Sequence, residues 1–152
     1  MTRAGVPTLE SHLGYWLRFV SNHVSASFAR KMAAEDVSVA EWVVMRVLFE
    51  RGAIAPSRLA DEIGMTRGGI TKIANRLIGR KLLLRADSAE DGRAQTLALS
   101  AAGARLVPKL AALADENERE FFADLSERER RQLERTLRSI VKRRGLKSVP
   151  VE

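Results

Sequence analysis

The stretch GMTRGGITKIANRLIGRKLL, residues 64–83, places two adjacent glycines inside a segment whose other residues predict a helix. Thr66 is a suitable N-cap, so we expect a helix over about residues 67–79. The apolar side chains of that helix share one face, formed by Ile70, Ile73, Ala74 and Leu77. The opposite face carries Gly68, Thr71, Lys72 and Asn75, with Arg67 and Arg76 at its edges. Because a glycine in a helix interior costs about 1 kcal/mol relative to alanine, the glycine pair requires an explanation.

The polar face of this helix has the side chains that recognition of the major groove needs. Hydroxyl and amide groups reach base edges, and cations meet phosphates. At the first turn, glycines let the backbone approach DNA closely, and the free N–H groups there suit a phosphate. We therefore expect DNA contacts in this region from Ser57, Thr66, Arg67, Gly68, Gly69, Thr71, Lys72, Asn75 and Arg76. The alternative is that the two glycines only loosen the first turn after the cap.

Two helices are predicted before this segment. Ser38 and Glu41 have the spacing of a capping box, which opens a helix that Gly52 ends. Pro56 then begins a short helix, for which Gly64 is the expected C-cap. Two short helices joined by a tight turn are typical of a helix-turn-helix.

A hairpin is predicted after it. The runs LLLRA (82–86) and QTLALS (95–100) flank the polar loop DSAEDGR (87–93), a pattern that indicates two strands. The hairpin completes a winged helix-turn-helix DNA-binding lobe over residues 38–99.

Long apolar stripes lie on both sides of this lobe. The stripe from Leu9 to Met32 predicts one helix of about seven turns over residues 9–35. Ser100 and Ser126 are the expected caps of two further amphipathic helices.

The lobe is too small to cover these stripes, and helices that flank a DNA-reading lobe commonly pack against a second copy of the chain. We therefore expect residues 9–35 and 100–145 to form a helical dimerisation region. The predicted fold is mainly α, with a two-stranded β wing and helices from both termini that form the dimer.

The composition excludes several classes of protein. The chain has 152 residues, of which 45% are hydrophobic and 30% charged, as in soluble globular domains. It has no cysteine, which excludes a disulfide framework, cysteine-ligated zinc and a thiol redox switch. It has neither a long apolar run nor the apolar core of a secretory signal. We therefore expect no membrane span and a cytoplasmic location.

The charge balance favours a polyanion as partner. With 26 Lys and Arg against 19 Asp and Glu, the net charge is +7. Residues 64–93 carry seven basic and three acidic side chains, a net of +4. Residues 126–152 carry nine basic and four acidic ones, a net of +5. The mixed signs of this second cluster fit a solvated helix face at least as well as a binding surface.

Residues 59–103 resemble the MarR family of winged helix-turn-helix transcriptional regulators. The wing of that family carries an arginine, then Asp-x-Arg, a short apolar strand, a hydroxyl residue and a glycine. The corresponding residues here are Arg85, Asp91, Arg93, Leu97–Leu99, Ser100 and Gly103. The family usually has glycine where Lys81 stands, just before the first wing strand. The order of the helices matches over about residues 9–145.

The resemblance implies a homodimer whose two lobes bind a palindromic or near-palindromic operator in double-stranded DNA, most often as a repressor. It places Arg85 in the DNA-binding wing, Arg93 in the minor groove and Asp91 as its brace. A cation at a hairpin tip suits the negative potential of a narrow, A·T-rich minor groove. The alternative for residues 91–93 is an ordinary solvated turn.

Many members of the family respond to a small aromatic or anionic effector bound between the dimer helices and the lobe. The resemblance makes Trp16, His23, Trp42, Met45 and Arg46 the candidate pocket residues. The alternative is that the tryptophans belong to the core and that the histidine is structural. No cofactor is expected.

Catalysis and metal binding are not expected. His12 and His23 are the only histidines, and no serine or carboxylate stands at a recognisable catalytic spacing from them. Asp87 and Asp91 lie in one loop without histidine support, which makes a poor metal site. The remaining alternatives are a non-specific architectural DNA binder and a winged helix that docks on another protein. Phosphate contacts weaken steeply with added salt, so salt dependence separates DNA binding from protein docking.

Overall fold

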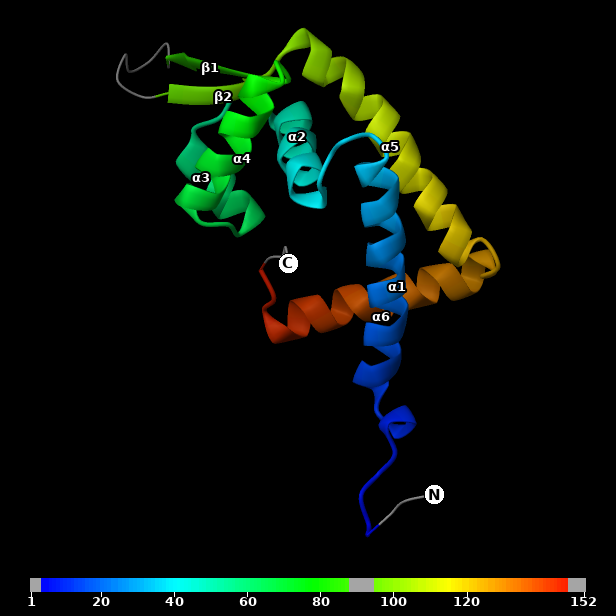
Figure 1. The fold of residues 1–152 in the computed structure, drawn as a ribbon. Coiled ribbons are helices and arrows are strands. Elements are labelled where there is room, and N and C mark those ends of the chain that lie inside the picture. The colour runs from blue at the N-terminus through cyan, green and yellow to red at the C-terminus, as the bar shows by residue number, and fades with distance from the viewer. Residues whose placement is uncertain (1–3, 88–94, 148–152) are drawn as a thin grey trace.

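The computed structural model describes residues 4–87 and 95–147. Its elements, in chain order, are a 3-10 turn (Leu9–Ser11), α1 (Leu13–Ala33), α2 (Val39–Arg51), α3 (Pro56–Ile63), α4 (Arg67–Gly79), β1 (Leu83–Asp87), β2 (Gln95–Leu99), α5 (Ala101–Phe122) and α6 (Glu127–Arg144). Figure 1 shows α2, α3, α4 and the hairpin gathered in one lobe. The long helix α5 leads from the hairpin, past α1, to α6. The predicted mainly helical fold with a two-stranded wing is confirmed.

The helices α2, α4, α5 and α6 begin where the sequence has a capping residue. The Ser38 hydroxyl accepts a hydrogen bond from the Glu41 N–H at 3.0 Å, and the Glu41 carboxylate accepts one from the Ser38 N–H at 2.9 Å. Ser126 and Glu129 form the same reciprocal pair at the start of α6. There the hydrogen bond from the Ser126 backbone N–H holds the pKa of Glu129 below its usual value. The Thr66 hydroxyl accepts from the Gly69 N–H at 3.0 Å and begins α4, as the sequence predicts.

The first helix is shorter than the predicted span of residues 9–35. His12 is extended, with φ −100° and ψ 127°, and it separates the 3-10 turn from α1. The carbonyl of Thr8 accepts hydrogen bonds from the Ser11 N–H at 3.1 Å and from the Ser11 hydroxyl at 2.7 Å. Such side-chain bonds compete with the helical backbone pattern, and apolar periodicity does not detect them.

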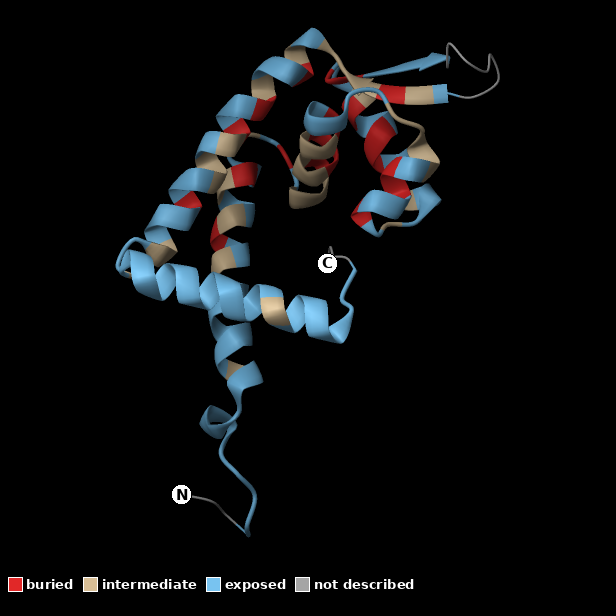
Figure 2. Cartoon of the chain, turned by 180° about the vertical axis from the view of Figure 1, so that it is seen from behind, coloured by how far each residue is buried: buried red, intermediate tan, exposed pale blue. Residues whose placement is uncertain are grey.

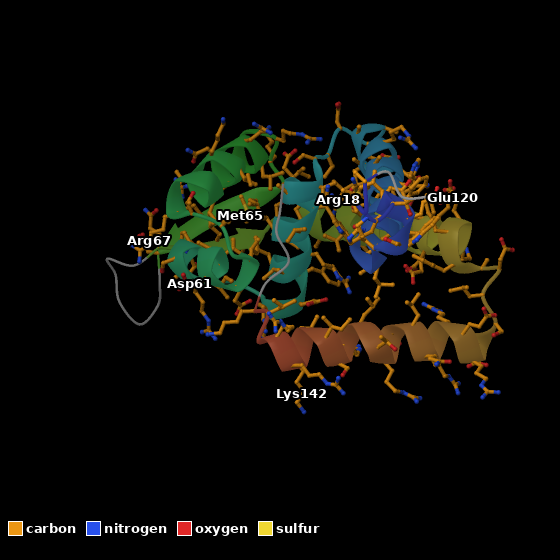
Figure 3. All side chains as sticks on the ribbon, turned by 90° about the horizontal axis from the view of Figure 1, so that it is seen from below. Arg18, Asp61, Met65, Arg67, Glu120 and Lys142 are labelled. Atoms are coloured by element: carbon orange, nitrogen blue, oxygen red, sulfur yellow. The ribbon has the colours of Figure 1, made fainter. Side chains whose placement is uncertain are left out.

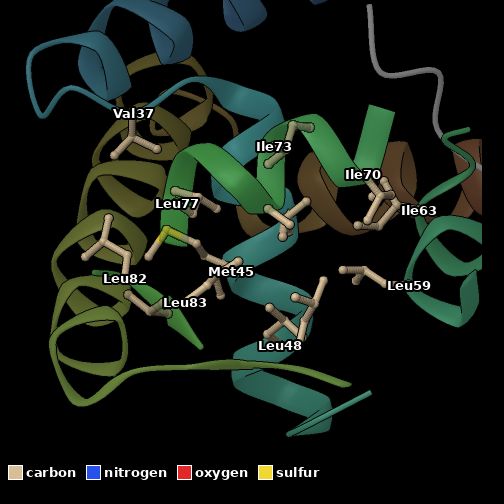
Figure 4. Close-up of a cluster of buried hydrophobic side chains, with 14 of the residues drawn as sticks. Val37, Met45, Leu48, Leu59, Ile63, Ile70, Ile73, Leu77, Leu82 and Leu83 are labelled. Atoms are coloured by element: carbon tan, nitrogen blue, oxygen red, sulfur yellow. The ribbon is translucent and has the colours of Figure 1, made fainter. Parts of the chain in front are cut away.

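The core of the lobe (residues 38–99) is formed by side chains from every helix and both strands. Figure 4 shows this cluster, in which α4 and α2 face each other. Its fully buried members include Met45, Leu48, Leu59, Ile70, Leu77, Leu83 and Leu97. The cluster continues into α1 and the first half of α5 through Met32, Val107 and Leu110. The inward face predicted for α4 is confirmed, because Ile70, Ile73, Ala74 and Leu77 are all buried.

A buried polar cluster attaches α1 to α5. The Lys31 ammonium donates to the Ser27 hydroxyl and to the Asn117 side-chain oxygen, both at 2.9 Å. The Asn117 amide donates to the Val24 carbonyl at 3.2 Å. Lys31 also pairs with Glu120 at 2.5 Å. Because the polar groups of Ser27 and Asn117 are buried and satisfied, they fix how the two helices pack.

The wing is anchored to the helix-turn-helix by a backbone bridge that the sequence did not predict. β1 and β2 pair antiparallel, with Leu83 opposite Leu99 and Arg85 opposite Leu97. Ile54, in the segment before α3, exchanges two hydrogen bonds with Leu97, at 3.1 and 2.8 Å. This bridge fixes the start of α3 beside the base of the wing.

The junction between the wing and α5 is close-packed around Gly103. The Ser100 hydroxyl donates to the Lys81 carbonyl at 2.7 Å and accepts from the Gly103 N–H at 3.0 Å. A Cβ atom at Gly103 would lie 2.2 Å from the Leu82 carbonyl oxygen. Lys81 has φ +62°, in the left-handed region that favours glycine. The backbone at this position thus has a conformation that favours glycine, although the residue is a lysine.

Candidate nucleic-acid interface

The turn between α3 and α4 directs the polar face of α4 away from the core. Gly64 ends α3 with φ +80°, and its N–H donates to the Ala60 carbonyl at 2.8 Å. The chain then reaches Thr66, the N-cap of α4, within two residues. With the apolar face of α4 buried against α2 and α3, its other face is exposed. Besides Gly79 at the C-terminal end of α4, the exposed residues are Arg67, Gly68, Thr71, Lys72, Asn75 and Arg76.

The two glycines at the start of α4 have different surroundings. A Cβ at Gly68 would have no heavy atom within 4 Å among the described residues. A Cβ at Gly69 would lie 3.1 Å from the Thr66 hydroxyl and 3.3 Å from the Met65 methyl. The absence of a side chain therefore has a packing reason at Gly69 but none within the described part of this chain at Gly68. Ser57, on the first turn of α3, is half-buried.

The cations of this region differ in how they are held. Among residues 4–87 and 95–147, Arg67 and Lys72 form no ion pair. Arg67 lies on the outer edge of the lobe (Figure 3). Arg76 and Arg80 each place a guanidinium nitrogen 3.9 Å from a carboxylate oxygen of Glu41. Arg67 and Lys72 are therefore the more available partners for a phosphate.

Glu41 is a residue of this region that sequence reasoning identified only as a cap. Its side chain is buried, and its Oε2 atom has no hydrogen-bond partner among the described residues. A buried carboxylate is costly unless it is paired, so the two arginines of α4 and its C-cap compensate its charge. Glu41 thus links the start of α2 to the end of α4. No local sequence signal indicated this contact, because it joins residues 35 and 39 positions apart.

Two hydrogen bonds organise the side chains on the exposed face of α4. The Thr71 hydroxyl donates to the Arg67 carbonyl at 2.9 Å. The Arg85 guanidinium, on β1, donates to the Asn75 side-chain oxygen at 3.1 Å. The predicted wing and helix residues Arg85 and Asn75 are thereby brought together. The predicted wing-tip residues Asp91 and Arg93 lie outside the described residues.

The effector-pocket candidates on α1 are exposed. Trp16 is 49% exposed, and its ring N–H donates to the Glu10 carbonyl at 2.9 Å. His23 stacks on Phe19, with 5.2 Å between the ring centroids. Both residues lie on the part of α1 where the apolar side chains of Leu13, Leu17 and Val20 are exposed.

The effector-pocket candidates on α2 make contacts with other residues of the same chain. Met45 is fully buried in the lobe core, as the structural alternative expects. Trp42 is half-buried and meets Phe28 edge-on, with ring centroids 6.4 Å apart. Arg46 pairs with Glu50 at 3.0 Å. The role of these residues in effector binding stays a prediction.

The arrangement of α3, α4 and the hairpin defines a winged helix-turn-helix protein with a basic, polar helix face on the outside. A sequence profile described as "MarR family" matches residues 35–94. Over these residues, which include α2, α3, α4 and β1, the chain is similar to the MarR family. Members of this family are regulators of transcription and not enzymes.

Three individual proteins show how far the likeness extends. The HTH-type transcriptional repressor IacR of Pseudomonas putida is 27% identical over 123 residues, which cover 81% of this chain and 74% of IacR. The structure of Bordetella bronchiseptica BpsR has a TM-score of 0.77 with this chain. The DNA binding of BpsR is regulated by 6-hydroxynicotinic acid. BpsR is 23% identical, over 90% of this chain and 97% of its own length. A mutant of E. coli MarR complexed with operator DNA has a TM-score of 0.75 at 20% identity, over 85% of this chain and 93% of MarR.

Two kinds of feature are absent from the described residues. No helix there is long and apolar enough to cross a membrane. No group of three or more His, Cys, Asp or Glu side chains in that part of the chain could hold a metal ion.

Proposed function

We propose that this chain is a sequence-specific repressor that binds a near-palindromic operator as a homodimer and releases it on binding a small effector. The exposed face of α4 is the observation that supports sequence-specific DNA binding in this proposal. This face has no apolar side chain and carries a hydroxyl, an amide and three cations. Its first turn is open at Gly68, which leaves room for close approach to a groove.

In this proposal Thr71 and Asn75 read base edges, whereas Arg67, Lys72 and Arg76 bind phosphates. Thr66, Gly68 and Gly69 bring the start of α4 to the DNA backbone, and Ser57 lies at the start of α3. Arg93, with Asp91, is proposed to reach the minor groove from the wing. The DNA-bound relative, E. coli MarR, supports the general docking of such a fold on an operator.

The dimer is proposed from the apolar faces of α1 and α6. α6 buries no residue and leaves Leu133, Leu137, Ile140 and Val141 exposed, at 42, 39, 41 and 47%. Most of the stability of a helix in a protein comes from packing of its apolar face, so α6, whose 18 residues include no buried one, needs a partner surface. Between α5 and α6 lies a groove of about 750 Å³, lined by Phe122, Leu125, Leu133, Leu137, Val141 and Leu146 among others.

The partner proposed for this groove is a second copy of the chain. The copy offers the apolar N-terminal side of its own α1, where Leu13 is 74% exposed and Leu17 44%. Residues 9–35 and 100–145 would thus form the dimerisation region, with two lobes presented together to two half-sites.

Repression is proposed because the relative IacR is a repressor. An aromatic or anionic effector is proposed because 6-hydroxynicotinic acid regulates the DNA binding of BpsR, which has a similar fold. In the dimer, the exposed Trp16 and His23 of α1 and the half-buried Trp42 and Arg46 of α2 are the residues that would meet it, beside Met45.

The proposal is tested by selecting bound fragments from the source genome with the purified protein. We expect strong enrichment of a site with inverted half-sites, steep loss of affinity with salt, and a dimer in sedimentation at micromolar concentration. Binding without any enriched sequence would indicate the architectural alternative. Salt-insensitive or absent DNA binding would indicate a protein-docking module. A stable monomer would refute the dimer.

A further inference from the structure

Two polar side chains at the centre of the exposed face of α4 have part of their hydrogen-bonding capacity already in use. Thr71 and Asn75 lie one helical turn apart and are both exposed. The Thr71 hydroxyl donates to the Arg67 carbonyl at 2.9 Å. The Asn75 side-chain oxygen accepts from the Arg85 guanidinium at 3.1 Å. Each residue therefore has fewer groups left for a base than its side chain would offer alone.

Arg85 reaches Asn75 because of the register of the wing. Arg85 on β1 stands opposite Leu97 on β2, and side chains of opposite residues project from the same face of a hairpin. Leu97 is fully buried, so this face is turned toward the lobe. The guanidinium of Arg85 consequently lies against Asn75 on the exposed face of α4 and not on the outer face of the wing.

The chemistry of arginine decides how the Asn75 amide is oriented. A guanidinium only donates hydrogen bonds, so the atom that it contacts must be the carbonyl oxygen of the amide. The oxygen has two lone pairs, and the bond from Arg85 uses one of them and turns the oxygen toward the wing. The amide nitrogen, which keeps both of its donors, is the group that this orientation leaves for DNA. An asparagine that reads adenine in the usual bidentate way needs both groups, because it donates to N7 and accepts from the N6 amino group.

We propose that Arg85 is a positioning residue that restricts Asn75 to donating, so that Asn75 selects guanine over adenine in the major groove. Guanine presents two acceptors, N7 and O6, whereas adenine presents its N6 donor beside N7. This inference rests on the proposed DNA-reading role of α4. Thr71, whose own hydrogen is used within the helix, faces the groove as an acceptor and does not replace the donor of Asn75.

The test is a selection of bound duplexes from a randomised pool, first with the wild-type protein and then with Asn75→Ala. The base pair at which Asn75→Ala loses preference is the one that Asn75 reads. Binding of two duplexes that differ only there, as guanine or adenine, is then measured. We expect the wild type to prefer guanine about tenfold. We expect Arg85→Ala to reduce this ratio at least roughly threefold with an unchanged unfolding midpoint, because the Asn75 oxygen becomes free for adenine.

Lys72→Ala is the matched control, since it removes a neighbouring exposed cation that contacts neither Asn75 nor Arg85 through a hydrogen bond among the described residues. It should weaken both duplexes equally and flatten the salt slope. If Arg85→Ala behaves in the same way and keeps the ratio, Arg85 binds a phosphate and the inference is wrong. A wild-type preference for adenine also refutes it while leaving the proposed function intact. No change with Asn75→Ala refutes it too and removes Asn75 from the base-reading residues, whereas sequence-specific binding by the rest of α4 would still stand. Failure of the wild type to enrich any sequence would instead overturn the proposed function itself.

Discussion

The lobe buries its apolar side chains within this chain, whereas α6 and the outer part of α1 leave theirs exposed. Leu77, on α4, is fully buried, and Leu137, on α6, is 39% exposed, although both belong to regular apolar stripes. Figure 2 shows the buried residues gathered in the lobe and along the adjoining parts of α1 and α5, with none on α6. The lobe therefore completes its core with the adjoining parts of α1 and α5, whereas α6 and the outer part of α1 bury no apolar side chain within the described residues.

This difference separates two uses of an amphipathic helix. In α4, the apolar face is fully covered and the polar face is left for a ligand. In α6, the apolar face is exposed, and the groove beside it is lined by cations as well as apolar side chains, among them Arg130, Arg138 and Lys142. We propose that the first arrangement makes a recognition surface and the second an assembly surface.

The largest effect on the free energy of unfolding is expected from shortening one side chain in the core of the lobe. Leu77→Ala removes a fully buried side chain and should lower the free energy of unfolding by about 3 kcal/mol. Leu137→Ala removes a half-exposed side chain and should cost less than about 1 kcal/mol in a single chain. Denaturant unfolding at several protein concentrations measures both.

The concentration dependence distinguishes the two regions. The loss of unfolding free energy caused by Leu77→Ala should be similar at every protein concentration. The loss caused by Leu137→Ala should be small for the monomer and should grow as the concentration rises through the range in which the dimer forms. If both variants lose the same amount at every concentration, α6 is not an assembly surface.

The second largest effect is expected at Gly103, where the wing joins α5. Because a Cβ there would lie 2.2 Å from the backbone oxygen of Leu82, Gly103→Ala should cost about 2 to 3 kcal/mol by displacing the start of α5. Thermal unfolding checks the loss. Gly79→Ala is the control, since a Cβ at Gly79 has no neighbour within 4 Å among the described residues. An equal, small effect of both substitutions would show that the junction is not close-packed.

The parts of the fold that depend on local chemistry were predictable from the sequence. The caps Ser38, Thr66, Ser100 and Ser126 begin the helices predicted from them, because each cap bonds to an N–H three residues away. Gly64 ends α3 in the left-handed conformation predicted by its position. The exposed and buried faces of α4 also agree with its 3.6-residue period.

The contacts that join distant residues were not predictable. The Ile54–Leu97 bridge, the Arg85–Asn75 bond and the position of Arg76 and Arg80 beside Glu41 depend on how helices and strands pack, which no local pattern specifies. The apolar stripes of α1 and α6 likewise predicted amphipathic helices without indicating what covers them. The break at His12 followed from side-chain bonds of Ser11 that compete with the helix.

A smaller effect, of opposite sign, is expected at Lys81. Its φ of +62° strains a lysine by about 1 to 2 kcal/mol, and glycine would relieve this at some cost in the entropy of the unfolded chain. Lys81→Gly should therefore raise the free energy of unfolding by about 1 kcal/mol. Lys81→Ala, which keeps the strain, is the control for the lost charge and should not stabilise. Equal effects of the two would mean that the strain at this position is negligible.

The smallest effect on stability is expected at Gly68, on the exposed face that distinguishes α4 from α6. A Cβ there meets nothing within the described residues, and alanine favours the helix, so Gly68→Ala should raise stability by about 0.5 kcal/mol. The same methyl group would enter the space between the first turn of α4 and DNA. The affinity for the operator should therefore fall although the fold is more stable. Gly69→Ala separates the two effects, because its Cβ would press on the Thr66 cap and cost stability. If Gly68→Ala binds the operator as tightly as the wild type, the first turn of α4 does not approach the groove. The open space at Gly68 would then have no role in DNA binding.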